Sequence, residues 1–171
     1  MSLGLYLHIP YCFSKCRYCD VYSHPGERGV PDAYVEALLR ELSRFAPEAP
    51  LQPDTLYFGG GTPSLLRPEQ AKRLIDAARP MPGAEITLEA NPETVTEESL
   101  AGFREAGVNR ISFGVQSARD TQLRTLGRPH TAKQARAAFA AARRAGFANI
   151  SGDIMLALPH YTEAEFDETL E

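Results

Sequence analysis

Short β-like runs alternate with helical patterns along almost the whole of this 171-residue chain. Each short apolar run is followed by a longer stretch in which apolar residues return at helical spacing. This alternation is typical of parallel sheets, in which helices connect the strands by right-handed crossovers. The sequence therefore predicts an α/β fold with a parallel β/α sheet of about five βα units.

The expected elements follow one another closely. Pro68 suits the first turn of a helix, and Thr131 with Gln134 forms a capping-box pattern at the start of another. A second capping-box pattern, Thr162 with Glu165, announces the last helix. We expect strands at residues 5–9, 55–58, 85–89, 110–115 and 150–156, and helices at residues 31–45, from 68, up to about 107, at 131–146 and from 162.

Five strands are too few to close a β/α barrel of eight. We therefore expect an open, partial barrel that is truncated at its C-terminus, because the last predicted helix is still running at Glu171. In this interpretation residues 1–171 are the N-terminal part of a core domain. The remaining barrel and a C-terminal domain are expected to be absent.

Charge and hydropathy exclude several classes of protein. The chain carries 22 acidic and 18 basic residues, a formal net charge of −4 and no long run of either sign, so it shows no electrostatic footprint for nucleic acid. No apolar stretch approaches the roughly 20 residues of a membrane span. Residues 3–9 lack the basic flank and the length of a signal peptide. We expect a cytoplasmic protein without an integral membrane segment.

The three cysteines of the chain, Cys12, Cys16 and Cys19, lie close together in a C-x3-C-x2-C pattern directly after the first predicted strand. Soft thiolates at this spacing can converge on one metal centre. An iron–sulfur cluster normally takes four protein ligands, so three thiolates with no fourth leave one iron open. An open iron can bind a cofactor.

A zinc site is the main alternative at this point. Zinc accepts histidine and carboxylate beside thiolate, so His8, Asp20 or His24 could supply a fourth ligand. Zinc ligands, however, usually come as two spaced pairs. A disulfide with a spare thiol is disfavoured, because an odd count without a secretory segment indicates a reducing compartment. The spacing favours a cluster over zinc, and zinc over redox or inert cysteines.

Polar or conformationally special residues follow each predicted strand, and parallel sheets bind ligands at that rim. The glycine run at 59–61 lets a backbone pass close to a ligand, although a plain turn would also explain it. Glu89 and Asp153 lie on strands expected to be largely buried, which predicts either a functional role or a structural ion pair. Gln116 and Arg128 lie in loops, where a solvated side chain is the ordinary expectation.

For the four histidines we expect structural or surface positions. His8 either packs under the cysteine loop as a hydrogen-bonded core residue or donates a hydrogen bond to the loop from outside. The other three are expected at the surface: His24, His130 and His160.

Several segments together resemble one family, the radical S-adenosylmethionine family. Within it the chain is similar to the oxygen-independent coproporphyrinogen oxidase group. The resemblance extends from Tyr6 to the end of the chain. The segments that carry it are Y-L-H-I-P-Y-C at residues 6–12, K-C-R-Y-C-D at 15–20, G-G-G-T-P at 59–63, L-E-A-N-P-E at 88–93 and S-F-G-V-Q-S at 112–117.

This resemblance implies two cofactors. Cys12, Cys16 and Cys19 would hold three irons of a [4Fe–4S] cluster, and S-adenosylmethionine would chelate the fourth iron through its amino and carboxylate groups. The residues that the resemblance places around S-adenosylmethionine are Tyr6, Tyr18, Gly59, Gly60, Gly61, Thr62, Glu89, Gln116, Arg128 and Asp153.

Individual roles around S-adenosylmethionine also follow from the resemblance. The glycine loop with Thr62 would lie against the methionine part, and Tyr18 near the adenine. Gln116 and Asp153 would reach the ribose hydroxyls, while Arg128 would pair with the carboxylate. Glu89 would also contact the cofactor, and Tyr6 would lie beside the sulfonium and the cluster.

One departure separates two functions inside the group. The oxidase enzymes carry a further cysteine where this chain has Val21. This favours the heme chaperone branch, whose members deliver heme to respiratory proteins, so heme or a porphyrin and a respiratory recipient are expected partners. The alternative is a coproporphyrinogen oxidase, which decarboxylates propionate side chains through a 5′-deoxyadenosyl radical. A zinc-stabilised structural module is the third hypothesis, and no catalytic residue is assigned.

Overall fold

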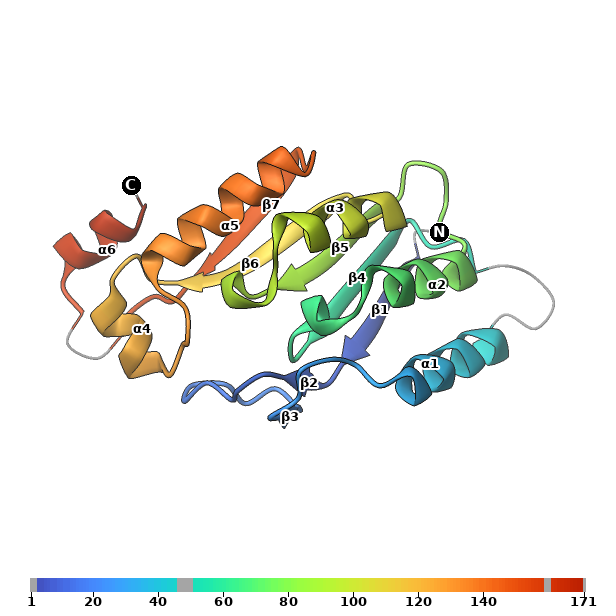
Figure 1. Ribbon diagram of the computed structural model, residues 1–171, viewed down its shortest axis with the longest axis horizontal. Coiled ribbons are helices and arrows are strands. Elements are labelled where there is room, and N and C mark those ends of the chain that lie inside the picture. The colour runs from blue at the N-terminus through green and yellow to red at the C-terminus, as the bar shows by residue number, and fades with distance from the viewer. Residues whose placement is uncertain (1–2, 46–50, 159–160, 171) are drawn as a thin grey trace.

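A five-stranded parallel sheet forms the centre of the protein (Figure 1), as seen in a computed structural model that describes residues 3–45, 51–158 and 161–170. All neighbouring strands pair in parallel, so the prediction of an α/β fold with a parallel sheet is confirmed. The predicted strand at 150–156 is two residues too long, because the chain leaves the sheet after Ile154. In sheet order the strands are β1 (Gly4–Ile9), β4 (Thr55–Gly60), β5 (Glu85–Ala90), β6 (Arg110–Gln116) and β7 (Asn149–Ile154).

Helices α2, α3 and α5 lie along one face of this sheet (Figure 1), and α1 packs beside α2. The capping box predicted at Thr131 and Gln134 is present at the start of α5. That helix ends at Arg144, two residues before the glycine where we expected its end. The helices are α1 (Asp32–Phe45), α2 (Pro68–Ala78), α3 (Glu97–Ala106), α4 (Asp120–Leu126), α5 (Ala132–Arg144) and α6 (Glu163–Leu170).

Short elements surround the cysteines. The two-residue strands β2 (Tyr11–Cys12) and β3 (His24–Pro25) pair with each other, and 3-10 turns η1 (Pro63–Leu65) and η2 (Pro92–Thr94) follow β4 and β5. Helix α4 was not predicted. It is one short helix between β6 and α5 that buries only Leu123 and Leu126, which is too little periodicity to read from sequence.

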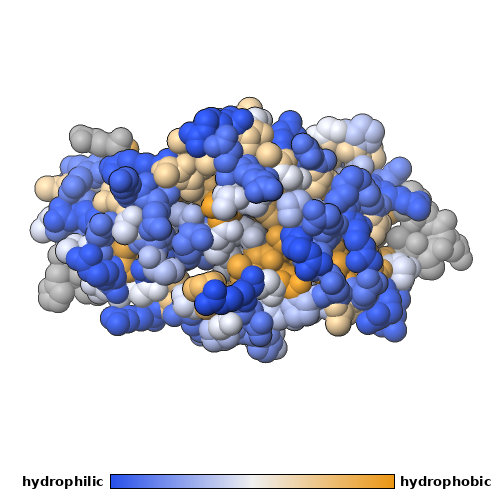
Figure 2. Space-filling model, in the orientation of Figure 1, coloured by the Kyte–Doolittle hydropathy of each residue, from blue (hydrophilic) through white to orange (hydrophobic). Residues whose placement is uncertain are grey.

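The two faces of the sheet differ in chemistry. Because side chains alternate along a strand, Leu56 and Phe58 of β4 point toward the helices, and both are fully buried there. The intervening Tyr57 points to the other face, where it bonds the carboxylate of Glu89 on β5. Seen from outside, the helical face is mostly hydrophilic, with hydrophobic side chains visible mainly in the gaps near its middle (Figure 2). The hydrophobic core therefore lies between the sheet and the helices, and the opposite face of the sheet carries polar groups such as Glu89.

The sheet is open, as predicted for a partial barrel. Its order places β1 at one edge and β7 at the other, and within the described residues these two strands do not meet. The prediction that Asp153 lies on a largely buried strand is wrong. Asp153 is exposed, because β7 is an edge strand without a fully buried residue. In the part of the chain that the structure describes, no helix is long and apolar enough to cross a membrane.

Candidate functional site

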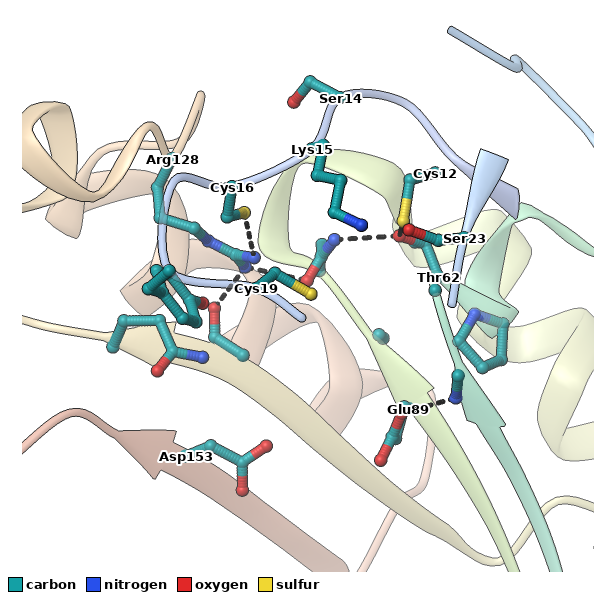
Figure 3. Close-up of a pocket in the computed structure, with 18 of the residues that line it drawn as sticks. Cys12, Ser14, Lys15, Cys16, Cys19, Ser23, Thr62, Glu89, Arg128 and Asp153 are labelled. Carbon is teal, nitrogen blue, oxygen red and sulfur yellow. Dashed lines mark hydrogen bonds between the residues drawn. The ribbon is translucent and has the colours of Figure 1, made fainter. Parts of the chain in front are cut away.

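One cavity opens at the carboxyl ends of the sheet strands, below the cysteine loop (Figure 3). Parallel strands deliver their C-terminal loops to the same rim, which is why residues far apart in sequence meet here. Tyr6 and Gly59 do not line the cavity. The predicted site residues that do line it are Cys12, Cys16, Tyr18, Cys19, Gly60, Gly61, Thr62, Glu89, Gln116, Arg128 and Asp153.

The cysteine loop is anchored at both of its sides. The amide of Glu27 donates to the carbonyl of Cys12 at 3.1 Å, and the amide of Arg17 donates to the carbonyl of Leu126, the last residue of α4, at 3.0 Å. Cys12 is buried, whereas Cys16 and Cys19 are half-buried, and all three are free thiols. The loop thus presents its sulfur atoms from a backbone that α4 holds in place.

The glycine run lets the β4 loop approach the cysteines. A Cβ added to Gly61 would lie 2.7 Å from the carbonyl oxygen of Tyr11 and 2.9 Å from Sγ of Cys12. Gly60 has a φ of +121°, a conformation that only glycine adopts without strain. Its added Cβ would lie 2.8 Å from the ring of His8. The glycines are therefore required by close packing, and a plain turn does not explain them.

A chain of hydrogen bonds links two cysteines across three loops (Figure 3). Nη1 of Arg128 donates to Sγ of Cys16 at 3.4 Å, and Nη2 donates to Oδ1 of Asn91 at 2.7 Å. Asn91 donates from Nδ2 to Oγ1 of Thr62 at 3.1 Å, and that hydroxyl donates to Sγ of Cys12 at 3.5 Å. The sequence analysis assigned no role to Asn91, although this residue lies in the L-E-A-N-P-E segment at 88–93.

Arg128 is the buried cation of the site. It is 8% exposed. Burial works to lower its pKa, but the hydrogen bond to Cys16 and the nearby Glu93 carboxylate raise that pKa above its ordinary value. The guanidinium therefore stays charged beside Sγ of Cys16.

Glu89 is the half-buried carboxylate of the site. It accepts hydrogen bonds from Oη of Tyr57 at 2.8 Å and from the amide of Gly60 at 3.2 Å. Burial raises its pKa above the ordinary value, and the charge of Asp153 acts in the same direction, against these two hydrogen bonds. Asp153 lies across the cavity (Figure 3) and accepts from Oγ of Ser112 at 3.4 Å. Within the described residues, neither Glu89 nor Asp153 forms the structural ion pair that was the alternative to a functional role.

Gln116 enters the cavity through a distortion of β6. The pairing of β6 with β7 shifts register between Gly114 and Gln116, which leaves Val115 as an extra residue. Gln116 has a φ of +70°, an unfavourable conformation for a residue other than glycine and one that often marks functional sites. The side chain is buried, so the expectation of a solvated loop residue is wrong for Gln116, as it is for Arg128.

The aromatic candidates have different surroundings. Tyr18 lines the cavity, and its partial burial together with Cys16 and Cys19 raises its pKa to about 12, against the opposing effect of Arg128. Tyr6 is 54% exposed and bonds Nδ1 of His8 at 3.1 Å. A Cβ on Gly59 would lie 2.7 Å from the Tyr6 ring. Tyr6 and Gly59 therefore pack against each other outside the cavity lining.

The three histidines of the described residues have different surroundings. His130 was expected at the surface, which is wrong: it is 2% exposed and hydrogen-bonded on both ring nitrogens. His24 is exposed, as predicted, and contacts Tyr22. Nε2 of His8 lies 3.0 Å from the carbonyl oxygen of Tyr22 in the loop, so His8 bonds the cysteine loop from β1. His160 lies outside the described residues.

Two buried polar atoms in the described residues have no hydrogen-bond partner, Nε of Arg128 and Oγ of Ser23. Both residues line the cavity. Buried polar groups are normally paired, so orphaned ones indicate that something else binds there. Three free cysteines, one buried cation and a glycine loop without space for a Cβ suit an iron–sulfur cluster with a polar cofactor beside it.

Fold and site together define a parallel β/α protein whose three cysteines line one cavity at the carboxyl rim of its sheet. The chain belongs to the radical SAM superfamily, whose family model matches residues 6–171. Membership in this family implies a [4Fe–4S] cluster and S-adenosylmethionine.

Two bacterial relatives are called heme chaperone HemW. The one from Escherichia coli K12 is 43% identical over 92% of this chain and 43% of its own length. The one from Bacillus subtilis 168 is 39% identical over 96% of this chain and 45% of its own. A bovine relative, radical S-adenosyl methionine domain-containing protein 1, mitochondrial, is 39% identical. The chain therefore spans less than half the length of these curated relatives.

Solved structures agree with the fold. Coproporphyrinogen III oxidase (HemN) from Escherichia coli, described as a radical SAM enzyme, superimposes with a TM-score of 0.88 and 31% identity, over 99% of this chain and 40% of that one. Methylornithine synthase (PylB) superimposes with a TM-score of 0.66 at 14% identity, which bears on the fold alone.

Proposed function

We propose that Cys12, Cys16 and Cys19 of this chain hold a [4Fe–4S] cluster with one open iron, which binds S-adenosylmethionine. The observation that carries this proposal is that the three cysteines, Arg128 and the glycine loop all line one cavity. When bound, the reduced cluster supplies one electron to the sulfonium of S-adenosylmethionine. The chain's own part is to hold charge and geometry around that centre.

Each side chain has a role in this proposal. Arg128 keeps a positive charge against Cys16 and offers its unpaired Nε to a polar ligand. Glu89 and Asp153 provide acceptors across the cavity, where Gln116 adds an amide. Gly60 exposes backbone to the cofactor at a point where any larger residue would meet His8.

The test is anaerobic reconstitution of the chain with iron and sulfide. We expect about four irons per chain, and an electron paramagnetic resonance signal of the reduced protein that shifts when S-adenosylmethionine is added. Cys16→Ser is expected to lose most of this iron. Ser43→Ala, at an exposed position of α1, is the matched control and keeps it. A parent chain that retains zinc and assembles no cluster would sink the proposal.

For the longer protein, we propose a heme chaperone that delivers heme to a respiratory protein. Relatives named heme chaperone HemW at 39–43% identity support this, as does Val21 in place of the further cysteine of the oxidases. The whole-length protein should bind heme and transfer it to a heme-free recipient, followed by the visible absorbance of both partners. Heme retention by the donor with every recipient offered would contradict this role.

Coproporphyrinogen oxidation is the second candidate, favoured by the structural likeness to HemN. The assay is anaerobic conversion of coproporphyrinogen to protoporphyrinogen by the reconstituted whole-length protein. The chaperone role predicts no conversion. Product formation that depends on S-adenosylmethionine would instead establish the oxidase.

A zinc module has less support. Among the described residues, no three His, Cys, Asp or Glu side chains, the three cysteines included, are grouped so that they could hold one metal ion. A [4Fe–4S] cluster needs no such grouping, because each thiolate binds a different iron. Nε2 of His24 lies within hydrogen-bonding distance of Tyr22, and Nε2 of His8 does so as well. We further propose the cytoplasm as the site of action, because three free, closely spaced thiols require a reducing compartment. Residues 1–171 then correspond to the N-terminal part of the radical SAM core domain.

A further inference from the structure

A buried pair of side chains, His130 and Glu93, lies behind the cavity without lining it. Nδ1 of His130 is 3.1 Å from Oε2 of Glu93, and Nε2 is 3.1 Å from the carbonyl oxygen of Val115. The His130 side chain is fully buried and that of Glu93 is 14% exposed. A carbonyl oxygen only accepts, so Nε2 carries the hydrogen in the bond to Val115.

The carbonyl that His130 binds belongs to the bulge of β6. Val115 is the extra residue of that bulge, so its carbonyl depends on a partner from outside the regular sheet. Directly after it comes Gln116 with its φ of +70°. A strained conformation of this kind persists only when its surroundings fix it. The hydrogen bond from His130 holds Val115, the residue directly before the strained Gln116.

The same loop also positions Arg128, two residues before His130. Nη2 of Arg128 donates to the carbonyl of Gly114 at 2.5 Å, so this loop binds two successive carbonyls of the bulge. Glu93 ties the loop to η2, which follows Asn91, the other partner of Arg128. Burial works to raise the pKa of Glu93, but the hydrogen bond with His130 holds that pKa below its ordinary value.

We propose that the His130–Glu93 pair is a clamp that positions Gln116 and Arg128 for S-adenosylmethionine. His130 and Glu93 are positioning residues that do not touch the cofactor. This inference rests on the proposed function, since it requires that the chain bind the cluster and S-adenosylmethionine.

The experiment measures S-adenosylmethionine affinity of the reconstituted chain by titrating the shift of its paramagnetic resonance signal. His130→Ala removes both hydrogen bonds, whereas His130→Gln keeps the capacity for one. Loss of a supporting partner behind a metal ligand typically costs about 10- to 100-fold in affinity, and we take the same range for the partners of Gln116 and Arg128. We expect that loss for His130→Ala with iron content unchanged, partial recovery for His130→Gln, and an intermediate loss for Glu93→Gln.

A readout without cofactor checks the positioning directly. In the metal-free chain labelled with 15N-arginine, the Nε–H of buried Arg128 should give a slowly exchanging signal. We expect faster exchange of this signal in His130→Ala, and a rate closer to that of the parent in His130→Gln.

Gln70 supplies the matched control. It is 1% exposed and, like His130, ties two segments together: its hydrogen bonds to Val30 and Asp32 hold α2 against the start of α1. It lies outside the cavity lining. Gln70→Ala should lower the melting temperature and leave affinity unchanged. Parent-like affinity and Arg128 exchange in folded His130→Ala and Glu93→Gln would overturn the clamp alone. Absence of a cofactor-induced shift in the parent chain would overturn the proposed function, and the clamp with it.

Discussion

Replacing Gly61 with alanine is expected to displace Cys12. The added Cβ would lie 2.7 Å from the Tyr11 carbonyl oxygen and 2.9 Å from Sγ of Cys12, and a backbone atom cannot rotate away as a side chain can. Overpacking of this kind typically costs about 1–3 kcal/mol. A chain of this size loses about 2–4 °C of melting temperature per kcal/mol, so we expect a fall of about 2–12 °C in the metal-free protein.

The same substitution should reduce cluster assembly, because relief of the clash moves the loop that carries Cys12. The assays are thermal unfolding followed by circular dichroism, and iron content after anaerobic reconstitution. Gly29→Ala is the matched control: its added Cβ would come no closer than 3.9 Å to Leu65, so both quantities should stay at parent values. A Gly61→Ala protein with parent-like melting temperature and iron content would refute the packing argument.

Three further predictions concern the metal-free chain. The raised pKa of Glu89 means that its ionised form destabilises the fold as pH rises above the ordinary value of 4.5; Glu89→Gln should therefore raise the melting temperature at pH 7 and not below pH 4.5, and no gain at pH 7 would contradict this. The lowered pKa of Glu93 has the opposite sign, with stability present above 4.5 and lost as pH falls through the folded-state pKa. Glu93→Gln should therefore lower the melting temperature at pH 7, by a deficit that shrinks in acid, and a deficit independent of pH would contradict a stabilising hydrogen bond between the Glu93 carboxylate and His130. Leu88→Ala, at a fully buried position, should lower the free energy of unfolding in urea by about 2–5 kcal/mol, against about 0.5 kcal/mol or less for Leu170→Ala, which is 60% exposed; equal effects would mean that β5 is not in the core.

Much of the sheet could be predicted from sequence because each of its strands is a short apolar run with clear ends. The run before Gly59 and the run before Gln116 both end where the structure ends β4 and β6, to within two residues. The capping residues Thr131 and Thr162 likewise predicted where α5 and α6 begin. Helix α4 was missed because it is short and buries only two leucines.

The site was harder to predict than the sheet, since burial and partners depend on packing across the sheet. Asp153 was expected to be buried, because sequence does not show that β7 is an edge strand. His130 was expected to be exposed, because its partners lie 15 and 37 residues away. Asn91 was overlooked for the same reason: its bond to Arg128 spans 37 positions.

The contact between Arg128 and Cys16 joins residues 112 positions apart. A ribosome adds about 5–20 residues per second, so Cys16 precedes its guanidinium partner by roughly 6–22 s during synthesis. Over that interval the three thiols are outside the site that later surrounds them, and they are open to oxidation or to the wrong metal. Loading of the proposed cluster into its complete site would therefore require that strands β1 to β6 have already come together.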